Sequence, residues 1–411
     1  MVEVSKRLDG IGEYYFATKL REIDALNKAG HKVINLGIGS PDLPPHTSVV
    51  EALHDEAIKE NTHAYQSYKG SPILRNAVAT WYKNWYGISV NPDTEVLPLI
   101  GSKEGIMHIC MTYLDKGDAA LIPNPGYPTY SSAVKLSGGE TLSYELKENE
   151  QWHPNVVDLK NLVQAYRMKN GKVKLLFLNY PHMPTGQLPE RHLLEEIIAF
   201  AKAEKILIIH DNPYSFILNE TPTSLFTIDQ AKDVVIELNS LSKSHNMAGW
   251  RVGMIVAAAE HVNNIMRFKS NMDSGMFLPV QIAASKALSL DKKWHDEVNA
   301  IYASRKKLAN ELLEMLGCSY SKNQAGMFVW AKIPSNYASG FELSDDVLEK
   351  AKVFITPGGI FGSAGNNYVR VSLCSKREVI EKNFNNWSWF DWWFIGFAMP
   401  EKRHCIPYHR S

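Results

Sequence analysis

The feature that most constrains the fold is an alternation of short apolar runs with polar stretches, between about residues 96 and 259. Runs that are apolar throughout are typical of strands buried on both faces of a parallel sheet, and the polar stretches between them have helical character. The six runs are VLPLIGS, AALIPNP, KLLFLNYP, ILIIHDNPY, VVIELNSLSK and MIVAAA. The pattern predicts an α/β fold with a mainly parallel central sheet.

Each of the first five runs ends in a polar or Gly/Pro-rich segment. Open α/β sheets bind their ligands in loops at the carboxyl ends of strands. We therefore expect the functional residues directly after these strands.

The segments on either side of this region have a different pattern. Apolar residues at helical spacing predict a helix over residues 11–29, and residues 33–45 indicate a short strand running into a turn. Beyond residue 288 the strings SRKKLANELLEML, MFVWAKI, SDDVLEKAK and YVRVSL alternate between helical and strand character. We predict a large α/β domain over 46–288 and a smaller α+β domain made of 1–45 plus 289–386.

Residues 387–411 form an atypical tail that contains WSWFDWW and fits no helical, strand or membrane pattern. A divergent extension and a shifted reading frame are both open interpretations of it, and we assign it no role.

Composition points to small-molecule chemistry. The 411 residues contain 44 Lys+Arg and 44 Asp+Glu, without a long run of either sign, which gives no indication of a nucleic-acid partner. No apolar stretch reaches the roughly 18 residues of a membrane span, and the N-terminus lacks the apolar core of a secretory signal. Four scattered cysteines without CxxC spacing are typical of free thiols, so we predict a cytoplasmic protein without a metal site.

The strongest chemical signal is SLSKSHNMAGWRVG, residues 240–253. Lys243 follows Ser240 and Ser242, whose hydroxyls flank it on one side, and Arg251 follows between two glycines. Lysine forms Schiff bases with aldehydes, and serine hydroxyls and an arginine fork satisfy phosphate oxygens. An ordinary surface lysine is the alternative, but the string suits a ligand that carries both a phosphate and an aldehyde.

Two further motifs are weaker when taken alone. DNPY begins at Asp211, and by itself it is also compatible with a capped turn. GSKEG, which contains Ser102 and Lys103, lies where a strand gives way to a helix, and a helix N-terminus binds anions through its free N–H groups.

Arg370 lies between two valines on a predicted strand. Burying an arginine without an anion is costly, and a substrate carboxylate would supply that anion in bidentate form. The alternative is an arginine on the solvent face of the strand.

The 240–253 string resembles the cofactor-lysine signature of fold type I pyridoxal 5′-phosphate (PLP) enzymes, the class I/II aminotransferase family. The resemblance extends from about residue 16 to residue 375, with the motifs in family order. The GSKEG and SHNMAGWRVG strings are most similar to the alanine and LL-diaminopimelate aminotransferase branches. The resemblance implies PLP as cofactor, with Lys243 as its Schiff-base lysine.

The resemblance also assigns roles to other positions. It implies that Asp211 pairs with the protonated pyridine nitrogen, that Tyr214 hydrogen-bonds the ring O3′ and that Tyr127 stacks on the ring. Tyr65 would reach the cofactor phosphate of the neighbouring subunit, which requires a homodimer. The implied phosphate contacts are Ser102, Lys103, Ser240, Ser242 and Arg251, and the implied contacts to the substrate carboxylate are Gly39 and Arg370.

One position departs from the family pattern. The family has N-P-T-G in a loop whose asparagine donates to O3′, whereas this chain has NYPHMPTG with Met183 at that position. Methionine cannot donate a hydrogen bond. Tyr214, His182 and Asn179 remain open as alternative donors.

These features together predict a PLP-dependent aminotransferase that moves an amino group between an L-amino acid and a 2-oxo acid by a ping-pong mechanism. Two alternatives stay open. A PLP-dependent β-lyase would use the same early steps on the same fold, and Met183 leaves room for a non-catalytic PLP-binding protein.

Overall fold

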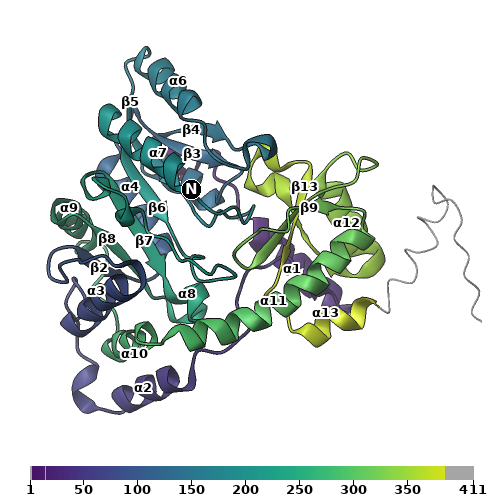
Figure 1. The fold of residues 1–411 in the computed structure, drawn as a ribbon, viewed down its shortest axis with the longest axis horizontal. Coiled ribbons are helices and arrows are strands. Elements are labelled where there is room, and N and C mark those ends of the chain that lie inside the picture. Colours follow the sequence, from purple (N-terminus) through teal and green to yellow (C-terminus); the bar gives the residue numbers. More distant parts are fainter. Residues whose placement is uncertain (1, 14, 385–411) are drawn as a thin grey trace, which may run out of the picture.

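The computed structural model describes residues 2–13 and 15–384, and its centre is a seven-stranded sheet (Figure 1). The strand order is β2-β8-β7-β6-β5-β3-β4. All six predicted runs form strands, and only β8 runs antiparallel to its neighbours, so the α/β fold with a mainly parallel sheet is confirmed. The strands are β2 (Val96–Leu99), β3 (Asp118–Asn124), β4 (Glu140–Glu145), β5 (Lys172–Leu178), β6 (Leu207–Asp211), β7 (Val235–Ser240) and β8 (Gly253–Ala257).

Strand β4 was not predicted. Its sequence ETLSYE is mostly polar, and of its side chains only that of Tyr144 is buried. The strand lies at the edge of the sheet and pairs with β3 alone, so it escapes the double-sided burial that makes the central strands apolar.

Helices cover both faces of this sheet (Figure 1). They pack against side chains of the central strands that are wholly buried, such as Leu175, Ile209 and Ile236. The helices in this part of the chain are α2 (Thr47–Ala57), α3 (Pro72–Tyr86), α4 (Ser102–Tyr113), α5 (Pro128–Leu136), α6 (Val156–Arg167), α7 (Arg191–Glu204), α8 (Leu241–Ser244), α9 (Ala259–Lys269) and α10 (Leu278–Leu288).

A second, four-stranded antiparallel sheet has the order β12-β13-β10-β9, and a separate parallel pair joins β1 to β11. Figure 1 shows the long helix α11 running from the vicinity of α8 and α10 towards this second sheet. The elements are α1 (Tyr15–Lys28), β1 (Ile34–Asn35), α11 (Lys292–Met315), β9 (Ser319–Tyr320), β10 (Phe328–Lys332), α12 (Gly340–Ala351), β11 (Val353–Phe354), β12 (Thr356–Pro357), β13 (Tyr368–Ser372) and α13 (Arg377–Phe384).

The predicted domain boundaries stay a prediction. The seven-stranded sheet lies within 46–288 and the four-stranded sheet within 289–386. Pairing of β1 with β11 ties the N-terminal segment to the C-terminal part of the chain, as the proposed division requires. The tail, residues 387–411, lies outside the described residues.

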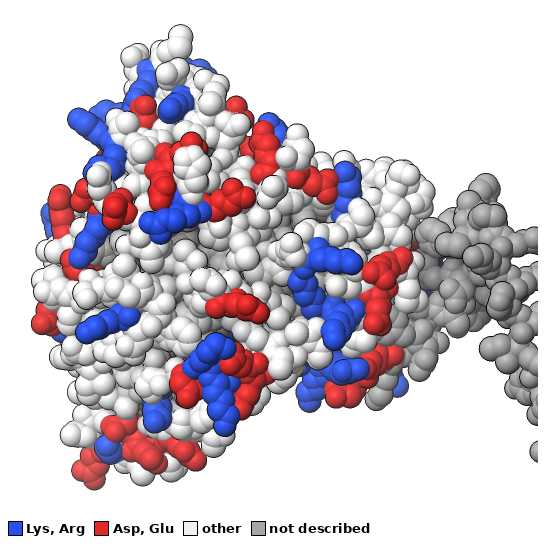
Figure 2. Space-filling view, viewed as in Figure 1, with Lys and Arg blue, Asp and Glu red and all other residues white. Residues whose placement is uncertain are grey.

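Figure 2 shows acidic and basic side chains next to one another over the visible face. Within residues 2–13 and 15–384, no helix has both the length and the apolar character needed to cross a membrane. The three cysteines in this part of the chain, Cys110, Cys318 and Cys374, are free and buried.

Candidate active site

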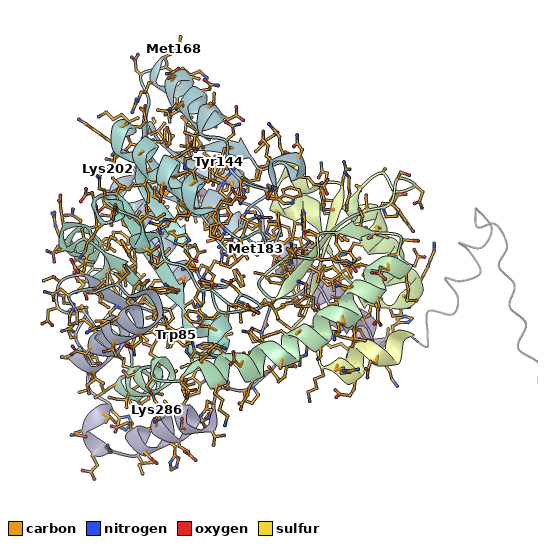
Figure 3. The ribbon with its side chains drawn as sticks, viewed as in Figure 1. Trp85, Tyr144, Met168, Met183, Lys202 and Lys286 are labelled. Atoms are coloured by element: carbon orange, nitrogen blue, oxygen red, sulfur yellow. The ribbon has the colours of Figure 1, made fainter. Side chains whose placement is uncertain are left out.

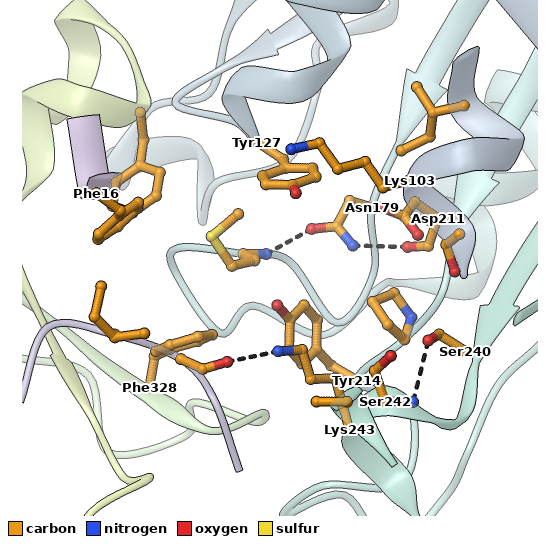
Figure 4. Close-up of a pocket in the computed structure, with 18 of the residues that line it drawn as sticks. Phe16, Lys103, Tyr127, Asn179, Asp211, Tyr214, Ser240, Ser242, Lys243 and Phe328 are labelled. Atoms are coloured by element: carbon orange, nitrogen blue, oxygen red, sulfur yellow. Dashed lines mark hydrogen bonds between the residues drawn. The ribbon is translucent and has the colours of Figure 1, made fainter. Parts of the chain in front are cut away.

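A cavity of about 490 Å³ lies between the two sheets, a size typical of ligand sites, which span roughly 300–1,000 Å³. It lies at the carboxyl ends of strands, where the sequence predicted it: β6 ends at Asp211, and β7 ends at Ser240. Figure 4 shows the cavity and its lining. The predicted site residues that line it are Gly39, Ser102, Lys103, Tyr127, Asp211, Tyr214, Ser240, Ser242, Lys243, Arg251 and Arg370.

Tyr65 does not line this cavity. Its side chain is 92% exposed in the single chain. The prediction places it at a neighbouring subunit's site, so an exposed position is compatible with that role.

Lys243 extends into the cavity from α8, a single helical turn directly after β7. The hydroxyl of Ser240 caps this turn by accepting from the N–H of Ser242 at 3.1 Å. The Lys243 Nζ donates to the carbonyl oxygen of Gly39 at 2.5 Å. Burial lowers the pKa of Lys243, and the positive charges of nearby arginines lower it further. A lowered pKa raises the fraction of neutral amine, which is the nucleophilic form.

Asp211 lies at the end of β6 with its two carboxylate oxygens in different surroundings. Oδ2 accepts from the hydroxyl of Tyr130 at 2.8 Å, whereas the buried Oδ1 accepts no hydrogen bond from the described residues. Burial raises the pKa of Asp211 to about 6, although the hydrogen bond from Tyr130 and the charge of His210 lower it. A buried acceptor without a donor is costly, so this site fits a ligand with a protonated ring nitrogen, such as PLP.

The raised pKa of Asp211 predicts a pH effect on the stability of the cofactor-free protein. Its pKa rises from 3.8 to about 6 on folding, so the folded state holds the proton more tightly. The contribution of Asp211 to the free energy of unfolding therefore falls as the pH rises from about 4 to about 6, and it is constant at higher pH. Asparagine does not titrate, so the melting temperature of Asp211→Asn should rise relative to that of wild type as the pH increases from about 4 to 6. Parallel melting curves for the two proteins would contradict this assignment.

The groups that could donate hydrogen bonds to a phosphate lie together, at the opposite end of the cavity from Phe16 and Phe328 (Figure 4). Helix α4 begins at Ser102, and its N-cap is Gly101 with a φ of 87°. The Ser102 hydroxyl donates to the carbonyl of Asn239 at 3.1 Å, and Arg251 Nη1 lies 3.5 Å from the Ser242 hydroxyl. A helix N-terminus, serine hydroxyls and an arginine thus converge on one anion-sized region.

Gly101 is required at this end of the site. A Cβ on Gly101 would lie 2.1 Å from Nη2 of Arg251, and its positive φ would strain any other residue. Gly101→Ala should weaken cofactor binding by roughly 5–150-fold, the equivalent of about 1–3 kcal/mol of backbone strain and displacement. Titration of the cofactor-free protein with PLP measures this.

Gly117→Ala is the matched control, because Gly117 has a φ of 89° but open space where its Cβ would lie. It should destabilise the fold without changing the affinity for PLP. Equal affinity losses in the two variants would show that strain alone, and not the displacement of Arg251, causes the effect.

Arg370 is buried on β13, so the alternative of a solvent-facing arginine is excluded. Its guanidinium carbon lies 3.8 Å from the ring centroid of Phe328 and 4.7 Å from that of Phe361. Nη2 donates to the carbonyl of Gly37 at 2.8 Å, and Nη1 lies 3.2 Å from the sulfur of Met183. Aromatic faces stabilise the buried cation and fix the orientation in which it meets a carboxylate.

Met183 therefore contacts the guanidinium of Arg370 through its sulfur, and Figure 3 shows it between the two sheets. Its N–H donates to Oδ1 of Asn179 at 2.8 Å, and Nδ2 of Asn179 donates to the Asp211 carbonyl at 2.6 Å. His182 lies outside the cavity lining, where its Nδ1 meets the hydroxyl of Thr185 at 2.8 Å. The sequence left Tyr214, His182 and Asn179 as alternative donors to O3′ in place of the family asparagine. Tyr214 and Asn179 line the cavity, whereas His182 does not.

Tyr130, Phe328 and Phe361 are among the residues of the site that sequence reasoning missed. Tyr130 follows Tyr127 by three positions, a helical spacing that is a usable signal for a second tyrosine on the same side of α5. Phe328 and Phe361 belong to β10 and a later 3₁₀ turn, and no motif connects them to Arg370.

The sequence matches the aminotransferase class I and II family over residues 31–383. The chain belongs to this family. It is 38% identical to an LL-diaminopimelate aminotransferase of Dehalococcoides mccartyi (strain CBDB1), over 93% of this chain and 97% of that protein. It is 37% identical to transaminase BacF of Bacillus subtilis (strain 168), over 89% of this chain and 91% of that protein.

Solved aminotransferase structures share the fold. A substrate-bound BacF structure superposes with a TM-score of 0.88 at 34% identity, covering 94% of this chain and 97% of that one. An aspartate aminotransferase of Thermotoga maritima superposes with a TM-score of 0.85 at 26% identity, covering 95% and 100%. The chain is therefore an aminotransferase of fold type I, a family that uses PLP, and the predicted similarity to LL-diaminopimelate aminotransferases is confirmed.

Proposed function

We propose that this aminotransferase transfers an amino group from an L-amino acid to a 2-oxo acid with PLP bound through Lys243. The observation that carries the proposal is the convergence of three groups in one cavity: the lysine amine, the Oδ1 of Asp211 and the guanidinium of Arg370. PLP at this site would supply an aldehyde for the amino group and a ring that withdraws electrons.

Several residues that line the cavity have separate roles in the proposed reaction. Lys243 would hold the cofactor through its amine, and the same amine would move the proton at the substrate Cα. Asp211 Oδ1 would keep the pyridine nitrogen protonated, and Arg370 would bind the substrate carboxylate together with Gly39. Tyr127 would cover the cofactor ring, and Tyr214 would hydrogen-bond its O3′. The cofactor phosphate would be held by Ser102, Lys103, Ser240, Ser242 and Arg251.

A half-reaction experiment tests this function. Adding amino acids one at a time to the PLP-loaded enzyme should change the absorbance of the bound cofactor and release the matching 2-oxo acid in equal amount. LL-diaminopimelate belongs in the panel, because a relative is named for it. If no member of a full panel releases a 2-oxo acid, or if cystathionine gives pyruvate and thiol without a co-substrate, the proposal fails.

We also propose that the enzyme is a homodimer in which Tyr65 completes the neighbouring site. The phosphate-binding side chains Lys103 and Arg251 are exposed in the single chain, as is Tyr65. Exposed Met272 and Phe277 lie near the Tyr65 segment, since the ring of His63 is 5.6 Å from that of Phe277. An apolar surface next to a half-open anion site favours a second copy of the chain as its cover. A cytoplasmic location stays a prediction.

Mixing two defective variants tests the shared site. Tyr65→Ala should weaken PLP binding at the partner's cavity, and Lys243→Ala should inactivate its own. Hybrid dimers of the two variants should regain activity, because one of the two sites combines an intact Lys243 with an intact Tyr65. Tyr68→Ala, also at an exposed tyrosine, is the control and should bind PLP like wild type. Absence of recovery in verified hybrids would contradict the shared site.

A further inference from the structure

The wall of the cavity next to Arg370 is apolar. Around the guanidinium carbon, the ring centroids of Phe328, Phe361 and Phe16 lie at 3.8, 4.7 and 5.6 Å. Figure 4 shows Phe16 and Phe328 at one end of the cavity and Lys103, Asp211 and Ser240 at the other. The apolar side chains that complete this wall are Ala17 and Leu20 of α1, and Ile38.

The charged side chains that line the described cavity are Lys103, Asp211, Lys243, Arg251 and Arg370, and each already has a role in the proposed reaction. The nearest cations of α1 are held elsewhere. Lys19 pairs with Glu22 at 2.8 Å and Arg21 with Glu13 at 2.5 Å, and neither Lys19 nor Arg21 lines the cavity.

The position of the substrate follows from the two groups that bind its common part. In the proposed reaction the substrate carboxylate binds Arg370 and its Cα faces Lys243. Its side chain would then extend along Phe16, Leu20 and Ile38, which line the same cavity. An apolar side chain is favoured there because it buries surface from water. A distal carboxylate or ammonium would lose its hydration without gaining a charged partner among the described residues of the same chain, which is costly.

We propose that this wall selects L-amino acids with a large apolar side chain, aromatic or aliphatic, over substrates with a second charged group. The proposal rests on the proposed transamination and specifies its amino donor. It separates this enzyme from the activity named for its LL-diaminopimelate relatives, whose substrate carries a charged group at both ends.

The test is the ratio of kcat/KM values in the half-reaction of the PLP-loaded enzyme. Phenylalanine, leucine and methionine form one group, and aspartate, glutamate and LL-diaminopimelate form the other. The best apolar substrate should exceed the best charged one at least about tenfold. A charged substrate that equals or exceeds it overturns the selectivity proposal while leaving transamination intact, whereas no turnover with any amino acid overturns the proposed function itself.

A charge introduced into the wall tests its role directly. Leu20→Arg places a cation beside the substrate side chain and should shift the apolar-to-glutamate ratio at least about tenfold towards glutamate. Ile301→Arg is the matched control, since Leu20 and Ile301 are both 39% exposed on helices and Ile301 lies outside the cavity. An unchanged ratio in a folded Leu20→Arg enzyme, or an equal shift in both variants, would contradict the assignment of the wall.

Discussion

Replacing Lys243 with alanine should lower kcat at least about 10⁴-fold, the largest effect we expect from any single substitution. The variant loses both the amine that holds the cofactor and the group that moves the proton at Cα. Since the phosphate and ring contacts remain, Lys243→Ala should still bind PLP, but borohydride should no longer fix the cofactor to the protein. In wild type, the same treatment followed by peptide mass analysis should place the cofactor on the peptide that contains Lys243.

Lys306→Ala is the matched control for this experiment. Burial lowers the pKa of Lys306 as it does that of Lys243, but Lys306 donates to the carbonyl of Gln324 at 2.5 Å and lies outside the cavity. Its removal should leave the kcat and the borohydride labelling unchanged. Substantial activity in Lys243→Ala, or labelling that persists there, would mean that another lysine carries the cofactor.

Replacing Asp211 with asparagine should lower kcat by about 10²–10³-fold, the cost of removing one preorganised charge from an active site. Asparagine has nearly the same shape and can still accept from Tyr130, so the fold and the PLP affinity should change little. What it removes is the negative charge that keeps the pyridine nitrogen protonated, and with it the electron demand of the ring. Stopped-flow half-reactions measure the loss at the chemical step.

Tyr130→Phe separates the charge of Asp211 from its hydrogen bond. This variant deletes the 2.8 Å contact to Oδ2 and leaves the carboxylate in place. It should lower kcat by much less than Asp211→Asn, because a single hydrogen bond to a charged group contributes about 1.5–3 kcal/mol at most to its stabilisation. If both variants lose equal activity, positioning by Tyr130 and not the charge of Asp211 is the dominant effect.

Local sequence determined the central strands and the residues that follow them. Uniformly apolar runs predict buried parallel strands, because burial on both faces leaves no position for polar side chains. Ligand-binding residues are expected directly after such strands, at the carboxyl edge of the sheet. Lys243, Asp211 and Ser102 were found in this way. Strand β4 was missed for the same reason, since a strand at the edge does not need an apolar sequence.

Only the tertiary structure decided how the end of the site around Arg370 is built. Arg370, Phe361, Phe16 and Met183 come from four separate segments, and no spacing in the sequence records that they meet. Sequence patterns report the burial and direction of one element at a time, whereas a substrate pocket depends on the packing of several elements against one another. The sequence by itself therefore determined the fold class and predicted the cofactor chemistry. The packing of α1 and the second sheet against Arg370 decided the apolar wall that we propose selects the substrate.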